Sequence, residues 1–377
     1  MKKILYLLLF ILLILSGCSN SFTNLKLDDR GYAEEVNLKY ISLQNEDAIV
    51  KNVILLIGDG MGANQVEVAR MELLKEGELF DLDKAEYKGE VITSCLNNYV
   101  TDSAAAATAF ATGVKTNYET LGKDKDGNDL KTIMDYAHEA GIKTGIITDK
   151  SLGDATPAAF SVRLENRYKL KETIPMQQMN SGIDILIGGG AADYVNYEKE
   201  ITAKGYDYVT TKEGLLDSKS SKIFATYSSG RLMNHATTVP TLAEMTNKAL
   251  NVLSKNKKGF FLMVEAGQID NRCDEGNIEE MARSVQDLDQ TLRVILNFAR
   301  SNKETLVVVL ADHETGGLII GEGKPNISWF TEPTRYHTPV NVPLYAYGTR
   351  SSIFDNKIID NTEVFFILMK MLNLKED

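Results

Sequence analysis

The sequence predicts an α/β protein built as a three-layer α/β/α sandwich, with a central, largely parallel sheet between two layers of helices. Several of the predicted strands are apolar throughout rather than alternating, which is typical of strands buried on both faces of a parallel sheet. Helical patterns lie between them, and strands that alternate with helices indicate a doubly wound fold. The predicted strands are 53–57, 145–148, 183–187, 260–264, 305–310 and 344–347.

The composition excludes several other classes of protein. Of the 377 residues, 44% are hydrophobic and 25% are charged, which rules out global disorder and collagen-like repeats. The formal net charge is −11 at pH 7. This charge argues against a nucleic-acid surface, because phosphate backbones are bound by concentrated Lys and Arg. Three cysteines are too few for a disulfide scaffold.

Residues 1–17 are expected to be a lipoprotein signal peptide. Two lysines precede an apolar run of twelve residues at 4–15, and small residues then lead to Cys18. The run is shorter than the roughly 20 residues that a membrane span needs. The ending resembles a bacterial lipobox, in which Cys18 carries lipid and begins the mature chain. An ordinary signal peptide with an incidental cysteine is the alternative. Loss of 1–17, with two lysines, changes the net charge from −11 to −11 − 2 = −13.

Two further segments follow the signal. Residues 18–47 are polar and aperiodic, so we expect a flexible tether that leaves the protein lipid-anchored at the cell envelope, on the periplasmic or extracellular side. Residues 48–377 are expected to form one α/β domain without internal repeats. Within it, apolar residues recur at helical spacing over 278–300, and a capping box at 241–244 predicts the start of the preceding helix. The acidic segment 124–129 is interpreted as a turn rather than a calcium loop, because its glycine is misplaced.

Acidic or metal-binding residues follow four of the predicted strands. Ligands of open α/β sheets bind beyond the carboxyl ends of the strands. Each such residue alone has an ordinary structural explanation, but carboxylates gathered at one edge repel one another unless a cation compensates them. The sequence therefore predicts a cluster of divalent metals. In chain order these residues are Asp59, then Asp154 and Thr156, then Glu265 and Asp270, and finally Asp312 and His313.

The ligand types indicate two kinds of metal. His313 and His337, together with Asp residues, suit zinc, which accepts imidazole nitrogen. Asp154, Thr156 and Glu265 offer oxygen only, which suits magnesium.

Ser103 precedes a run of four alanines and is expected at or near the amino terminus of a helix. An N-cap serine is the ordinary interpretation. The same position, however, offers a positive dipole end and free backbone N–H groups, which stabilise an alkoxide or a phosphate. A nearby metal would lower the pKa of the hydroxyl further, so a serine nucleophile there needs no histidine base.

Six motifs, in order between about residues 50 and 350, resemble those of the bacterial alkaline phosphatase family, and their combination is highly specific although each is short. The resemblance implies hydrolysis of small phosphate monoesters through a phosphoserine, with release of inorganic phosphate. It also implies two zinc ions, one magnesium ion and a sheet flanked by helices. The motifs are Asp59-Gly-Met-Gly, Thr101-Asp-Ser-Ala-Ala, Asp154-Ala-Thr-Pro-Ala-Ala, Val264-Glu-Ala-Gly-Gln-Ile-Asp270, Ala311-Asp-His-Glu-Thr-Gly-Gly and His337-Thr.

The resemblance also implies a role for each matching residue. Ser103 matches the phosphorylated nucleophile, and Arg167 matches the arginine that clamps the phosphate, although an isolated arginine in a polar loop is usually only solvated. The remaining matches are metal ligands: Asp59, Asp312 and His313 for the zinc beside the serine, with Asp59 also bridging to magnesium; Asp154, Thr156 and Glu265 for magnesium; Asp270 and His337 for the zinc at the leaving group.

The sequence departs from the family at Asp274, where the resemblance implies a second histidine for the leaving-group zinc. If the segment is helical, Asp270 and Asp274 share a face, so Asp274 can still point at the metal. We expect an altered site that tolerates manganese, cobalt or magnesium better. Cys273 is the competing ligand; it is otherwise a buried thiol or the partner of Cys95 in a disulfide.

Only 23 residues separate His313 from His337, so the accessory crown region of larger relatives is expected to be minimal and a homodimer stays an open possibility. His138 and His235 match no motif and are interpreted as surface or core residues. The alternatives to a phosphomonoesterase are a phosphodiesterase or sulfatase of the same superfamily, and a degenerate lipoprotein that binds metal or phosphate without turnover.

Overall fold

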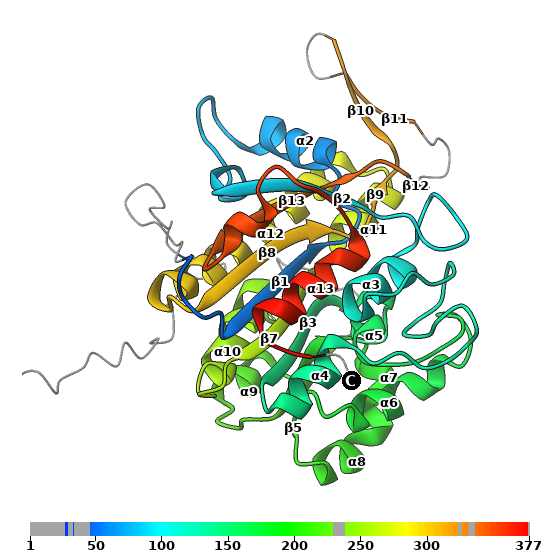
Figure 1. Ribbon diagram of the computed structural model, residues 1–377, viewed down its shortest axis with the longest axis vertical. Coiled ribbons are helices and arrows are strands. Elements are labelled where there is room, and N and C mark those ends of the chain that lie inside the picture. The colour runs from blue at the N-terminus through cyan, green and yellow to red at the C-terminus, as the bar shows by residue number, and fades with distance from the viewer. Residues whose placement is uncertain are drawn as a thin grey trace, which may run out of the picture.

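A ten-stranded sheet forms the centre of the protein, with strand order β14-β2-β13-β8-β1-β7-β3-β4-β6-β5. The computed structural model (Figure 1) describes residues 27–28, 33, 46–228, 238–322, 326–330 and 336–375. Within the described sheet, only β13 runs against its neighbours, so the largely parallel sheet is confirmed. The strands are β1 (Asn52–Gly58), β2 (Tyr87–Ile92), β3 (Lys143–Ser151), β4 (Ile185–Gly189), β5 (Asp207–Val209), β6 (Ile223–Tyr227), β7 (Phe260–Ala266), β8 (Thr305–Ala311), β13 (Val342–Gly348) and β14 (Ile358–Asp360).

Helices cover both faces of the sheet, as the sandwich prediction requires (Figure 1). One layer contains α2, α10 and α11, which each pack on α12, and the other contains α4, α5 and α13, which each pack on α3. The helices are α2 (Ala63–Leu73), α3 (Ser103–Thr112), α4 (Ile133–Ala140), α5 (Ala155–Ala159), α6 (Ile174–Asn180), α7 (Ala191–Tyr194), α8 (Glu198–Ala203), α9 (Lys212–Asp217), α10 (Leu242–Leu253), α11 (Gln268–Asp274), α12 (Ile278–Ser301) and α13 (Asn361–Met371).

The apolar runs became the buried centre of the sheet. Every residue of β1, β7 and β8 is buried, because these strands have neighbours on both sides and helices on both faces. The predicted strands missed β2 and β14 at one edge of the sheet and β5 and β6 at the other. In β2 the burial largely alternates, and β5 and β14 have only three residues each, so they lack the apolar run that marks a central strand.

Several smaller expectations are confirmed. Thr241 and Glu244 form the capping box of α10, and the long amphipathic helix α12 spans Ile278–Ser301. The segment 124–129 is a turn, in which the Asp124 carboxylate accepts hydrogen bonds from the backbone N–H groups of Asp126 and Asn128.

The chain between His313 and His337 is short and contains two small sheets, in line with a minimal crown region. β10 (Leu318–Gly321) pairs with β11 (Asn326–Trp329), and β9 (Glu314–Thr315) pairs with β12 (His337–Thr338). The predicted signal peptide, Cys18 and most of the tether lie outside the described residues. Among the residues that the structure describes, no helix combines the length and the apolar character that a membrane crossing needs.

Candidate metal centre and active site

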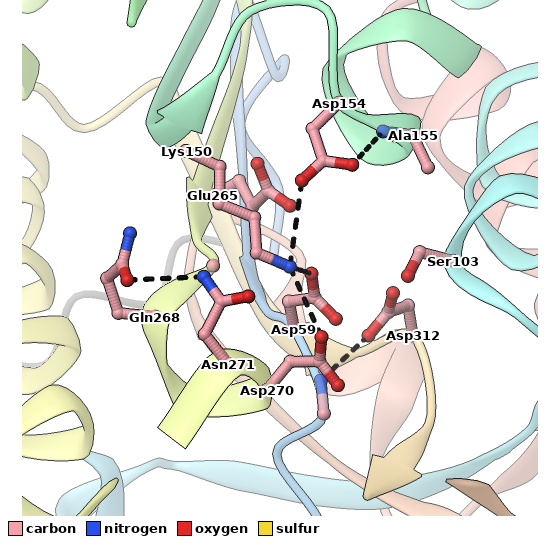
Figure 2. A network of polar contacts seen from close by, with 12 residues as sticks. Asp59, Ser103, Lys150, Asp154, Ala155, Glu265, Gln268, Asp270, Asn271 and Asp312 are labelled. Atoms are coloured by element: carbon pink, nitrogen blue, oxygen red, sulfur yellow. Dashed lines mark hydrogen bonds and ion pairs between the residues drawn. The ribbon is translucent and has the colours of Figure 1, made fainter. Parts of the chain in front are cut away.

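The four acid-bearing strands are neighbours in the sheet, in the order β8-β1-β7-β3, and all four are parallel. Their carboxyl ends therefore meet at one edge, as the sequence predicted. Two details differ from the prediction. Glu265 lies inside β7 rather than after it, and β3 continues three residues beyond Thr148 to Ser151. Figure 2 shows the acidic side chains converging on one region, with Ser103 at its margin.

The loop after β1 is tight, and it brings Asp59 and Asp312 together. The Asp59 N–H donates to the carbonyl of Ala266, and the Gly60 N–H donates to Asp312 Oδ1 at 3.1 Å. Gly60 has φ of +73°, which suits glycine. A Cβ at this position would lie 2.7 Å from Thr315 Oγ1 and 2.9 Å from the Cα of Asp270, so only glycine lets the three segments approach this closely.

Asp59, Asp312 and His313 form the first group of side chains that could hold a metal ion; their ligand atoms lie within 4.8 Å of one another, and all three residues are buried. His313 Nε2 lies 3.4 Å from Asp59 Oδ1, 3.3 Å from Asp312 Oδ2 and 3.1 Å from Ser103 Oγ. Neither carboxylate oxygen has a hydrogen bond. Burial and the nearby Asp59 charge raise the pKa of Asp312 well above its usual value. A cation between these oxygens would remove that cost.

Asp270, His313 and His337 form the second group. The pairing of β12 with β9 places His337 opposite Thr315 and stacks its ring on that of His313, with 3.4 Å between the ring centroids. His337 Nε2 lies 3.7 Å from Asp270 Oδ1. Burial opposes ionisation of Asp270, but Lys150, His313 and His337 together lower its pKa below the usual value.

Hydrogen bonds fix the tautomers of both histidines. Thr315 Oγ1 donates its one proton to Asp270 Oδ1 at 2.7 Å, so it accepts from His313 Nδ1 at 3.2 Å. His337 Nδ1 lies 2.8 Å from the carbonyl of Thr101, which can only accept. Both rings therefore carry their proton on Nδ1 and present the Nε2 lone pair, which is the arrangement that metal-binding histidines use.

Ser103 is the first residue of α3. The N-cap of this helix is Asp102, so the ordinary interpretation of Ser103 as the N-cap is wrong. The Asp102 carboxylate accepts hydrogen bonds from the N–H groups of Ala104 and Ala105. The Ser103 hydroxyl is therefore free of capping and points at His313 Nε2 instead. The predicted position near a helix amino terminus is confirmed.

The residues expected to hold magnesium lie close to Asp59. Asp154 is the N-cap of α5, and Thr156 lies in its first turn. Thr156 Oγ1 and Glu265 Oε1 are buried without a hydrogen bond, while Thr148 Oγ1 donates to Glu265 Oε2. Burial, together with the nearby Asp59 charge, raises the pKa of Glu265 well above its usual value. These oxygen donors suit a hard cation.

Lys150, a buried lysine near the end of β3, was not among the predicted site residues. Its Nζ lies 2.6 Å from Asp59 Oδ2, 3.3 Å from Asp270 Oδ2 and 3.8 Å from Asp154 Oδ2, as Figure 2 shows. Burial opposes the charge, but Asp59, Asp270 and Asp154 raise the pKa of Lys150 well above its usual value. A lysine two residues after the predicted strand 145–148, and four residues before the predicted ligand Asp154, was the available signal.

Arg167 is paired rather than simply solvated. Its guanidinium lies 2.7 Å from Asp154 Oδ1 and 3.4 Å from Asp102 Oδ2, so it sits between the magnesium-type ligands and the start of α3. Burial alone would lower the pKa of Arg167, and the Asp154 charge raises it above the usual value.

Asp274, the proposed replacement for a histidine ligand, lies on the predicted helix but outside both groups. Asp274 lies in α11 four residues after Asp270, as expected, but its carboxylate is not in either of the two groups that could hold a metal ion. Burial and the Asp270 charge raise the pKa of Asp274 to about 6.

Cys95 and Cys273 are both buried free thiols, which excludes the disulfide between them. His138 is exposed on α4, and His235 lies outside the described residues.

Known proteins resemble this chain over most of its length. A family model described as alkaline phosphatase matches residues 50–352. Alkaline phosphatase 4 of Bacillus subtilis is 35% identical over 352 residues, covering 88% of this chain and 74% of the relative. The alkaline phosphatase of Escherichia coli is 30% identical over 413 residues, covering 87% of each chain.

Solved structures show the same similarity in three dimensions. Alkaline phosphatase from the Antarctic bacterium TAB5 superposes with a TM-score of 0.78 at 28% identity, covering 87% of this chain and 99% of that one. A His-to-Asp variant of the same enzyme, with magnesium bound in a site called M3, superposes with a TM-score of 0.76.

Proposed function

The chain belongs to the alkaline phosphatase family and is a phosphate monoester hydrolase, and we propose that it works through a phosphoserine formed on Ser103. The single observation that carries this proposal is the position of the Ser103 hydroxyl. It lies at the start of α3, 3.1 Å from His313 Nε2, and the same nitrogen faces the unbonded oxygens of Asp59 and Asp312. A nucleophile needs a group that lowers the cost of its ionisation, and this is the place where a cation fits.

Two metal ions fit the residues present. Asp59, Asp312 and His313 would hold one, and Asp270 and His337 would hold the other, with Asp274 as the proposed third ligand. The Nε2 lone pairs and the unbonded carboxylate oxygens are the donor set that zinc prefers. When bound, the two ions supply charge stabilisation for the attacking and leaving oxygens of an in-line displacement.

The predicted magnesium site fits less well. Thr156 and Glu265 offer unbonded oxygens, but the Lys150 ammonium already lies between Asp59 and Asp154, which would share the ion.

The chain's own residues then carry out two displacement reactions at phosphorus. Ser103 Oγ gives up its proton to solvent water and attacks phosphorus. A phosphorus–oxygen bond to Ser103 forms as the bond to the ester oxygen breaks, and the alcohol leaves after taking a proton from water. Arg167 holds two nonbridging oxygens with its planar pair of donors. In the second step, water attacks phosphorus and displaces Ser103, which releases inorganic phosphate. The same groups bind the product, so phosphate inhibits.

Replacement of Ser103 by alanine tests the nucleophile. We expect turnover of a chromogenic monoester by Ser103→Ala to fall by at least about 1,000-fold, with no protein-bound ³²P after acid quenching. Ser284→Ala is the matched control, because Ser284 is buried in α12 and its hydroxyl only donates to the carbonyl of Glu280. Near-wild-type turnover or persistent labelling of Ser103→Ala would show that Ser103 is not the nucleophile.

We also propose that lipid on Cys18 holds the enzyme at the cell envelope. The basic start, the apolar run at 4–15 and the small residues before Cys18 support this location. Metabolic labelling with a palmitate analogue should mark the wild-type protein and leave Cys18→Ser unlabelled and released. Equal labelling of both proteins would contradict the proposal.

A further inference from the structure

The Lys150 ammonium lies where a third cation of the site would bind. It approaches Asp59 through Oδ2, at 2.6 Å, whereas the other oxygen of that carboxylate faces His313. Its other two partners are Asp270 Oδ2 at 3.3 Å and Asp154 Oδ2 at 3.8 Å. Asp59 and Asp154 are two of the residues predicted to hold magnesium. One carboxylate thus serves the metal group on one side and a lysine on the other.

The surroundings are built to hold this side chain. Only 6% of the Lys150 side chain is exposed. Gly267 makes room for its stem, since a Cβ at Gly267 would lie 2.6 Å from Cδ and 2.7 Å from Cγ of Lys150. The backbone is fixed on both sides: the Lys150 N–H donates to Thr148 Oγ1, and the neighbouring Asp149 carboxylate accepts from the Gly267 N–H at 2.7 Å.

A magnesium ion and this ammonium exclude one another. Magnesium binds oxygen at about 2.0–2.1 Å and demands near-octahedral geometry. An ion shared by Asp59 Oδ2 and Asp154 Oδ2 would take the space in which Nζ now lies, and the two positive charges would repel in a buried region. Removal of the ammonium would leave the unbonded oxygens of Thr156 and Glu265 to complete a set of four oxygen donors.

We infer that Lys150 serves as the fixed third cation of this site in place of magnesium, so that the chain holds two divalent ions rather than three. The ammonium neutralises one oxygen of Asp59 and keeps the other directed at the metal held with Asp312 and His313. Lys150 is therefore a positioning residue, and it makes the site independent of magnesium. The metal count concerns the same site as the proposed phosphatase activity, but it is measured without turnover, so the two can fail separately.

Elemental analysis of the whole purified protein tests this inference. After equilibration with millimolar magnesium and micromolar zinc, followed by gel filtration, we expect two divalent ions and no stoichiometric magnesium per wild-type chain. Lys150→Met should gain one equivalent of magnesium. Lys212→Met is the matched control, because Lys212 also pairs with a carboxylate, that of Glu244, but lies at the start of α9 after the edge strand β5. It should keep the wild-type count.

Thermal unfolding provides a second readout. A cavity of about 600 Å³, lined in part by Lys150, Asp154 and Asn271, gives ions access to this region. Added magnesium should therefore raise the melting temperature of Lys150→Met but not that of the wild type or Lys212→Met. One equivalent of magnesium in the wild-type protein would overturn the inference, and this result needs no variant. A Lys150→Met protein that folds but gains no magnesium would also overturn it.

Discussion

His313 Nε2 lies 3.1 Å from Ser103 Oγ, although 210 positions separate the two residues in the chain. The contact joins the loop after β8 to the first turn of α3. Because the tautomer of His313 leaves a lone pair on Nε2, the same nitrogen faces the hydroxyl and the carboxylates of Asp59 and Asp312. The proposed nucleophile and one proposed metal position are therefore set by a single ring, and the residues that orient this ring should control metal binding.

The Thr315 hydroxyl orients the His313 ring, so its removal should weaken zinc binding. Thr315→Val keeps the shape but removes the acceptor for His313 Nδ1 and the donor to Asp270. We expect the zinc dissociation constant to rise by about 10–100-fold, as for other partners of metal-binding histidines. Competition with a fluorescent chelator measures it. Thr246→Val, in the buried face of α10, is the control and should leave zinc binding unchanged. Equal affinities for Thr315→Val and the wild type would refute the assigned tautomer.

Arg167 should bind the phosphate group of the substrate. Arg167→Lys replaces a planar pair of donors by a single ammonium, so the bound phosphate should lose about 1.5–3 kcal/mol of binding free energy from charged hydrogen bonds. The expected result is a 10–100-fold increase, approximately, in both the KM for a monoester and the inhibition constant of phosphate. Steady-state kinetics checks both. Arg163→Lys is the matched control, because Arg163 pairs with Asp135 instead. An unchanged phosphate inhibition constant would remove Arg167 from the site.

The choice between Asp274 and Cys273 as the third ligand can be decided by a pair of variants. Cys273 is fully buried, and burial raises the pKa of its thiol well above the usual value, which disfavours the thiolate that zinc binds. Cys273→Ser should therefore keep the wild-type zinc content. Asp274→His should raise the affinity for zinc relative to manganese and cobalt, since imidazole is the softer ligand. Loss of one zinc from Cys273→Ser would show instead that the thiol is the ligand.

Gly60 should tolerate no side chain. Gly60→Ala strains a backbone with positive φ by about 1–2 kcal/mol and forces apart Thr315 and Asp270. We expect a lower melting temperature together with a loss of activity and bound metal. Gly205→Ala separates the two effects, because Gly205 has φ of +85° but nothing lies within 4 Å of an added Cβ. That control should lose stability only. Full metal content and activity in Gly60→Ala would contradict the close approach.

Asp289 should make stability depend on pH. Burial and the nearby Asp81 charge raise the pKa of Asp289 to about 7, above the value of about 4 in an unfolded chain. Between these values the folded state binds one proton more than the unfolded state, so its stability falls as pH rises from 4 to 7 and then levels off.

Asp289→Asn removes this titration while it keeps an acceptor for the Leu82 N–H. From pH 7 to pH 5 the wild type should therefore gain stability relative to the variant, by at most about 1.4 kcal/mol per pH unit. Urea unfolding of both proteins at each pH measures the difference, so that pH effects on bound metal cancel. The exposed Asp126→Asn serves as the control. A difference between Asp289→Asn and the wild type that does not change with pH would refute the raised pKa.

Much of the site could be predicted because its signals are local. An apolar run that ends in Asp59 or in Asp312 and His313 marks both a buried strand and its carboxyl end, and a serine before four alanines marks the start of a helix. The strands β2, β5 and β14 were missed because partial burial or few residues left them without such a run, and β6 was missed although its five residues are all buried. Asp102, rather than Ser103, caps α3, and the local pattern does not distinguish two adjacent capping residues.

The sequence by itself determined which chemical groups the protein brings to its active edge: carboxylates, two imidazoles, a hydroxyl and a guanidinium. Only the tertiary structure decided which of them meet. The order β8-β1-β7-β3 gathers groups from distant segments, the pairing of β9 with β12 stacks His337 on His313, and the extension of β3 turns Lys150 inward. Strand periodicity is encoded by adjacent residues, whereas the direction of a long side chain depends on neighbours that the fold supplies from elsewhere in the chain.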